Sequence, residues 1–156
     1  RNTYQATQLA DQANRLVPDE PDDGLQAMLT FYASGPEAAL AVVSASGTLE
    51  RDNLRAAFLL ELGRIEEARA VLDQIDIQYN PTAETFRLRA LLSFVTGNVE
   101  QARLAAQRAL ALEPEGEAVR LVAACIDYFS SIAACSCPAV LPAVPEPVDW
   151  VFVKRD

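Results

Sequence analysis

Three cysteines carry the most reactive side chains of this sequence: Cys125, Cys135 and Cys137. Cys135 and Cys137 are too closely spaced for the usual zinc motifs and have no second pair, so a metal site is not favoured. A disulfide from Cys125 to Cys135 or Cys137 is geometrically open if the helix that carries Cys125 ends near Ser131. That disulfide would favour an extracytoplasmic or extracellular location over the cytoplasm. The other interpretation is that all three are inert thiols.

The chain contains no histidine. This absence excludes serine and cysteine triads that use an imidazole, histidine-bound zinc, and the commonest general base. Carboxylates are frequent, but Asp22, Asp23, Glu66, Glu67 and Glu100 all fall at expected helix starts, where they interact with the positive end of the helix. Because no group of residues combines acid, base and nucleophile roles, the sequence predicts no catalytic residues, no metal and no cofactor.

Composition narrows the class of protein further. Of 156 residues, 51% are apolar and 22% are charged, which is typical of a folded chain. The net charge of −9 opposes binding to a phosphate backbone, so no nucleic acid partner is expected. The longest uncharged stretch, 128–145, is interrupted by three prolines and does not predict a membrane span.

Small residues recur with a period near 34. The clearest match is between Leu62–Ala68 and Thr96–Ala102, and we call the offset between these two segments one repeat period. Two series of alanines follow the same period, apart from one shorter step in each: Ala27, Ala56, Ala90, Ala124, and Ala6, Ala39, Ala68, Ala102. Alanines at such a period indicate positions where two helices cross closely, and they predict a stack of helix pairs.

The pattern predicts eight helices, separated by prolines and by glycines in tight turns. The turns after two of the helices place Gly63 and Gly97 where a positive φ is required. The expected helices span 3–17, 23–33, 36–46, 49–62, 65–77, 82–95, 99–112 and 115–131.

The chain resembles the tetratricopeptide repeat (TPR) family over about residues 3–131. The residues that carry the resemblance are Ala6, Ala10, Ala13 and Pro18, then Ala56, Gly63 and Ala68, then Ala90, Gly97, Ala102, Ala109 and Pro114. The resemblance implies an all-α, right-handed α-solenoid over 1–136 with a concave face that binds a ligand. The second helix pair is about five residues shorter than the others, and Leu59 and Ser93 stand where the family usually has tyrosine.

The resemblance also implies which residues line the concave face: Phe31, Tyr32, Asn53, Leu60, Arg87, Leu91 and Phe94. Family members that clamp a terminal carboxylate use lysines there, but the one lysine of this chain is Lys154. An apolar or helical guest is therefore expected. The other interpretation is that the aromatic residues of this set belong to the solenoid core.

The two ends of the repeat pattern are unpaired helices. The segment 3–17 matches the second helix of a repeat, and 115–131 matches a first helix. Each is the half that the other lacks, so we expect head-to-tail contacts that are heterologous and form an open filament. Residues expected in that contact are Tyr4, Leu9, Ala10 and Ala13 of one protomer with Leu121, Ala124, Cys125 and Tyr128 of the next. The competing explanation is that other proteins or further helices of a longer chain cover both ends.

The last residues, 137–156, differ in composition from the rest. Four prolines between 138 and 147 favour an extended path, and Trp150 and Phe152 follow in a short apolar segment. Exposed aromatic residues are unfavourable in water, so this segment is expected to anchor in a groove of its own chain or of a neighbour.

Two functions follow from these features. The first is a non-enzymatic scaffold for protein–protein interaction that self-assembles as a homo-oligomer through its incomplete ends. The alternative is a peptide-binding TPR adaptor that is a fragment or subunit of a larger complex. Twelve arginines against one lysine point to a bacterial source with a GC-rich genome.

Overall fold

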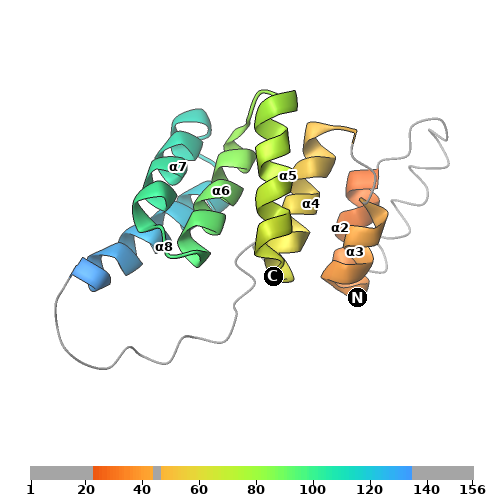
Figure 1. The fold of residues 1–156 in the computed structure, drawn as a ribbon, viewed down its shortest axis with the longest axis horizontal. Coiled ribbons are helices and arrows are strands. Elements are labelled where there is room, and N and C mark those ends of the chain that lie inside the picture. The colour runs from red at the N-terminus through yellow and green to blue at the C-terminus, as the bar shows by residue number, and fades with distance from the viewer. Residues whose placement is uncertain (1–22, 44–46, 135–156) are drawn as a thin grey trace. The chain divides into compact units, whose positions relative to one another are not determined.

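A computed structural model describes residues 23–43 and 47–134 of the chain (Figure 1). Within these ranges the chain is all α-helical and contains no strand, so the all-α prediction is confirmed for the described residues. The residues form two compact units, one up to Tyr79 and one from Asn80. The first unit contains α2 (Asp23–Ser34), α3 (Pro36–Val42), α4 (Leu49–Glu61) and α5 (Ile65–Gln78), and the second contains α6 (Ala83–Val95), α7 (Val99–Leu112) and α8 (Glu117–Ala134).

Seven of the eight expected helices are present, and the expected helix at 3–17 lies outside the described residues. Most helix ends agree with the expected ones to within three residues. The expected helix 36–46 is wrong at its end, because α3 stops at Val42. The last helix continues to Ala134, beyond the expected end at 131, and the hydroxyl groups of Ser130 and Ser131 donate hydrogen bonds to backbone carbonyls one turn earlier in α8. The expected boundary between solenoid and tail, at 136, also lies outside the described residues.

Two helix hairpins, one repeat period apart, close with the same turn. Gly63 and Gly97 have φ of 69° and 80°, in the left-handed region that glycine adopts without strain. In each turn the N–H of the residue after the glycine donates to the carbonyl five residues earlier, over 2.8 Å in both cases. The glycine N–H donates to the carbonyl three residues before it, over 3.0 Å in both cases. This pair of hydrogen bonds satisfies carbonyls at the ends of α4 and α6 and lets α5 and α7 fold back beside them (Figure 1).

Side chains mark where several helices begin. Thr82 and Thr85 form a reciprocal capping box at the start of α6, in which each hydroxyl accepts a hydrogen bond from the other residue's backbone N–H. At the start of α7, the Asn98 side chain accepts from the Gln101 N–H at 3.2 Å. These contacts satisfy N–H groups that have no partner inside the helix, so the sequence determines the first turn of both helices locally.

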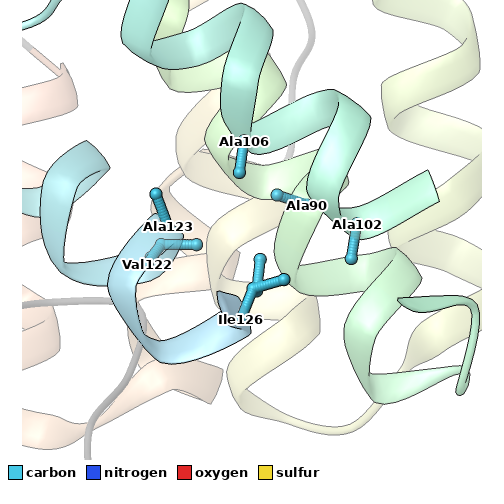
Figure 2. Close-up of a cluster of buried hydrophobic side chains, with 6 residues drawn as sticks. All are labelled: Ala90, Ala102, Ala106, Val122, Ala123 and Ile126. Carbon is cyan, nitrogen blue, oxygen red and sulfur yellow. The ribbon is translucent and has the colours of Figure 1, made fainter. Parts of the chain in front are cut away.

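One cluster in the core of the second unit joins alanines of α6 and α7 to two branched residues and one alanine of α8 (Figure 2). Ala90 of α6 and Ala102 and Ala106 of α7 pack against α8. The α8 side chains in this cluster are Val122, Ala123 and Ile126. Alanine leaves little side-chain volume between α6 and α7, so α7 can pack closely on α6 and on α8 at the same time.

In the first unit α4 packs on α5, α2 packs on α3, and α4 also contacts both α2 and α3. Its largest fully buried side chains include Phe58, Leu59, Leu72 and Ile75. The alanine pattern is matched by burial in both units, because six members of the two series are fully inaccessible to solvent: Ala27, Ala39, Ala56, Ala68, Ala90 and Ala102. Ala6 lies outside the described residues, and Ala124 behaves differently, as described next.

Candidate functional site

Helix α8 has apolar residues on two opposite faces. On one face, Val119 and Ile126 are almost fully buried against α6 and α7. The opposite face is apolar as well, and its residues recur every three or four positions, so they form one continuous stripe along the helix. We call this stripe the free face of α8, and it consists of Leu121, Ala124, Cys125, Tyr128 and Ile132.

The free face of α8 is accessible to solvent. Leu121 is 43% exposed, Tyr128 is 63% exposed and Ile132 is 39% exposed. Between Leu121 and Ala134 the single charged residue is Asp127, which forms an ion pair with Arg103 of α7 at 3.5 Å. The free face therefore combines an aromatic ring and aliphatic side chains with no charge of its own. An apolar face of this kind is typical of a surface that packs against another protein segment.

The face of α6 that corresponds to the free face of α8 is covered by neighbouring helices. One repeat period before Leu121, Ala124 and Tyr128 stand Arg87, Ala90 and Phe94. Arg87 is 3% exposed, Ala90 is fully buried, and Phe94 is half-buried in the cluster that Ala90 forms with α7 and α8. The face is thus covered in α6 and accessible in α8.

Helices α6 and α8 bury the same repeat positions on their inner faces. Thr85, Leu88 and Leu92 of α6 are at most 4% exposed. Their counterparts one repeat period later, including Val119 and Ile126, are equally buried. The repeat period therefore holds on the buried face, and the free faces can be compared residue by residue.

Ala124 differs in burial from the other described alanines of the two series, and its expected contact with a second protomer stays a prediction. Ala124 is exposed, although its counterpart Ala90 is fully buried. Ala90 packs against α7, the helix that follows α6, but no described helix follows α8. Ala124 has the correct position for a crossing, and the crossing helix is absent from the described residues.

Among the described residues Cys125 has no disulfide partner; its thiol lies on the free face, and burial raises its pKa. The disulfide depended on a helix end near Ser131, and α8 continues three residues further, to Ala134. Ala134 lies about 13.5 Å along the helix axis from Cys125, and disulfides join Cα atoms less than about 7 Å apart. A bridge to Cys135 would therefore require the end of α8 to unwind. Cys135 and Cys137 lie outside the described residues, so the disulfide stays a prediction.

The residues expected on a concave face mostly take part in packing. The Arg87 guanidinium donates two hydrogen bonds to Glu84, at 2.6 and 2.7 Å. Phe31 stacks on Phe58 with ring centroids 5.5 Å apart, and Phe94 lies 5.7 Å from Phe129. Asn53 is buried, Leu60 and Leu91 are half-buried, and Tyr32 is 44% exposed. Four of these seven residues lie in the first unit and three in the second.

Sequence analysis missed one member of the free face, Ile132. The expected helix ended at 131, so the stripe was taken to stop at Tyr128. The signal was present, because Ile132 follows Tyr128 by one helical turn on the same face. The other residues expected at an interface lie outside the described residues: Tyr4, Leu9, Ala10, Ala13, Trp150 and Phe152.

Comparisons of the chain with protein-family models, with curated proteins and with solved structures found no match. None of the described helices has both the length and the apolar character needed to cross a membrane. The interpretation of the free face of α8 therefore depends on its own geometry and on its comparison with α6.

Proposed function

We propose that this chain is a non-enzymatic scaffold for protein–protein interaction, built as a TPR-like solenoid, whose free face of α8 binds a helix of a protein partner. One observation carries the proposal. Ala124 and Tyr128 are exposed, whereas Ala90 and Phe94, at the same positions of α6, pack against a following helix. A helix partner would bury the apolar surface that α8 leaves in water, and burial of apolar area drives most protein association.

The repeat interpretation is supported by features at three levels. The sequence repeats Leu62–Ala68 at Thr96–Ala102, the Gly63 and Gly97 turns close with the same hydrogen bonds, and α6 and α8 bury matching positions. All three features recur at the same repeat period. This agreement favours a helix-pair repeat over an irregular bundle, because an irregular bundle has no reason to repeat its turns and its buried positions together.

The chemistry of the free face defines the partner. The face carries no charge, so a partner side chain that is charged would be buried there without compensation. In α6 the corresponding face accepts α7, which presents Ala102 and Ala106 to it. The partner is therefore an amphipathic helix with small residues along its apolar side. The absence of histidine from the sequence supports a binding role over a catalytic one.

A peptide-binding adaptor that uses the expected concave face is the alternative. It would need polar and aromatic side chains that are free to contact a guest. Asn53 and Arg87 are buried, and Phe31 and Phe94 contact other rings. Tyr32 is the exposed member of the set, and one side chain defines no binding site. The adaptor role stays a prediction.

The test uses a helix that resembles the one α6 already accepts. A fluorescent peptide of residues 99–112 is stapled through positions 103 and 107, which are both exposed in α7, so that it is helical before binding. We expect saturable binding to the dilute full-length protein by fluorescence anisotropy. Tyr128→Arg should weaken binding at least tenfold, because it places a charge in the contact. Gln107→Arg in the protein, which adds the same charge on the exposed side of α7, should leave it unchanged.

A matched peptide provides the second control. Ala106→Arg in the peptide alters the residue that packs on α6 and α8 in the native unit, so it should also abolish binding. If neither peptide binds, or if both bind equally well to the protein and to its Tyr128→Arg variant, the free face of α8 is not a helix-binding surface and the proposed function is wrong.

A further inference from the structure

We infer that the helix which covers the free face of α8 is segment 3–17 of a second copy of this chain. This inference rests on the proposed function and names the partner of the same site. The segment lies outside the described residues, and the inference therefore depends on what the free face requires and on the sequence of the segment.

The segment repeats the contact residues of α7. In α7, Ala102, Ala106 and Ala109 are at most 4% exposed, and they pack against α6 and α8. The same three alanines, with the same spacing between them, stand at Ala6, Ala10 and Ala13. Both segments are also followed by a proline, Pro114 and Pro18. Segment 3–17 is thus suited to the place beside α8 that α7 occupies beside α6.

Side-chain size distinguishes this segment from α5, the second helix of the α4–α5 hairpin. In α5 the first alanine is kept as Ala68, but the next two contact positions are Leu72 and Ile75, both fully buried. The α4 face beside α5 has Leu60 at the position of Phe94 in α6 and Tyr128 in α8. In the α6–α7 hairpin the aromatic residue Phe94 thus accompanies alanines on the second helix, whereas in the α2–α3 hairpin Phe31 accompanies Ala39 and the buried Val43. A large Tyr128 side chain leaves room for small residues on the partner helix, and segment 3–17 has alanines at those positions.

The charges of segment 3–17 fit this placement. If the segment is helical, Ala6, Leu9, Ala10 and Ala13 form one stripe at spacings of three and four. Its charged residues, Asp11 and Arg15, fall on the opposite side of the helix, as does Tyr4, so Tyr4 is not part of the contact inferred here. The contact would therefore bury no unpaired charge on either side.

The helix that follows segment 3–17 continues the match. Helix α2 stands in the same place after 3–17 as α8 does after α7. Leu25, two residues before Ala27, is 41% exposed, whereas Val122, two residues before Ala124 of the same alanine series, is 4% exposed. A second copy that docks through 3–17 would bring Leu25 toward the apolar surface that Val122 reaches in α8. Docking would then extend an arrangement of helices already present in α6, α7 and α8.

The sequence that follows α8 disfavours a covering helix between 138 and 147. Four prolines stand between 138 and 147, and proline inside a helix removes a hydrogen bond and clashes with the preceding turn. Each copy offers one free face of α8 and one segment 3–17. The contact between copies is therefore heterologous, and further copies can be added at either end.

The experiment uses the full-length chain and two complementary variants. We expect the mass from light scattering during size exclusion to rise with concentration above the 16.9 kDa of one chain. Ala10→Arg damages the docking segment, and Ala124→Arg damages the free face, so each variant alone should stay monomeric. Their mixture should form a dimer of twice that mass and nothing larger, because one intact contact remains. Gln8→Arg and Gln107→Arg, each with the same added charge away from the contact, should assemble like the parent.

Other outcomes would overturn the inference. Circular dichroism first checks that each variant keeps the helical content of the parent. A parent that is monomeric at every concentration while the stapled α7 peptide still binds would exclude the second copy and leave the proposed function intact. Assembly that survives both Ala10→Arg and Ala124→Arg would exclude this contact. Assembly that begins only after truncation behind Ser136 would show that the chain's own tail covers the free face. If the parent protein neither assembles nor binds the stapled peptide, the proposed function is wrong as well.

Discussion

Helices α6 and α8 stand one repeat period apart in the sequence and have different surroundings. Both bury the inner face, where Leu88 and Val122 are at most 4% exposed. On the other face, Ala90 of α6 is fully buried and Ala124 of α8 is exposed. Both helices have an alanine and an aromatic residue at the same spacing on this face, so the different burial of Ala90 and Ala124 arises from the neighbouring helices.

The comparison shows how an incomplete repeat can be recognised. An amphipathic helix at the surface of a finished domain has one apolar face and one polar face. Helix α8 has two apolar faces, as α6 does, but only one of them is covered in the described residues. An outer helix with the pattern of an internal helix therefore indicates a missing partner.

The largest expected effect is a difference between two identical substitutions. Ala90→Leu should lower the free energy of unfolding by about 1–3 kcal/mol, because the added side chain overpacks the contact of α6 with α7 and α8. Ala124→Leu should change it by less than about 0.5 kcal/mol, since Ala124 faces solvent. Urea unfolding of both variants at low protein concentration, where any assembly is dissociated, measures the difference.

The contrast has an internal control. Ala102→Leu, on the α7 side of the same cluster, should be as destabilising as Ala90→Leu. Equal losses for Ala90→Leu and Ala124→Leu would mean that Ala124 is covered in the isolated chain. If Ala90→Leu and Ala102→Leu both leave the free energy of unfolding unchanged, the small residues of this core are not required for helix packing.

The sequence predicted the helices well because their ends depend on local chemistry. Thr82, Asn98, Gly63 and Gly97 act within a few residues of their own position, and each does so in the structure. Whether a face is covered depends on elements far away in sequence. The sequence assigned Ala124 to the same repeat position as Ala90 and predicted that the last helix is unpaired, but it could not show how far each face is exposed to solvent.

A smaller effect is expected at the turns shared by the two hairpins. Gly63→Ala and Gly97→Ala should each lower the free energy of unfolding by about 1 kcal/mol, because alanine is strained at positive φ. No atom lies within 4 Å of a Cβ added at either glycine, so the loss reflects backbone strain alone. The two losses should be equal, because the turns have the same hydrogen bonds.

Gly47 is the matched control for the two turn glycines. Its φ is outside the positive range, and an added Cβ would meet only the end of the flexible Arg51 side chain at 4.0 Å. Gly47→Ala should therefore be neutral or slightly stabilising, through reduced freedom of the unfolded chain. Clearly different losses for Gly63→Ala and Gly97→Ala would contradict the equivalence of the two repeats.

The smallest effect concerns the Cys125 thiol on the free face of α8. Burial raises the pKa of this thiol, so the folded protein holds less of the reactive thiolate than the unfolded chain near pH 8. In a variant with Cys135→Ser and Cys137→Ser, iodoacetamide should therefore react more slowly with the folded protein than with the chain in urea. The gap should narrow as the pH rises above the pKa of the folded state.

The same titration should affect stability with a definite sign. Because the pKa of Cys125 is higher in the folded state, its contribution to stability is complete below the pKa of the unfolded thiol and is lost as the pH rises through the folded value. Cys125→Ala should remove this loss of stability at alkaline pH.

If a second copy covers the free face, iodoacetamide labelling of Cys125 should also slow as the protein concentration increases, and Ala10→Arg should abolish that protection. If the protein assembles but the labelling rate of Cys125 does not depend on protein concentration, the contact between copies lies elsewhere. The free face of α8 would then stay exposed to solvent in the assembly, unlike the same face of α6.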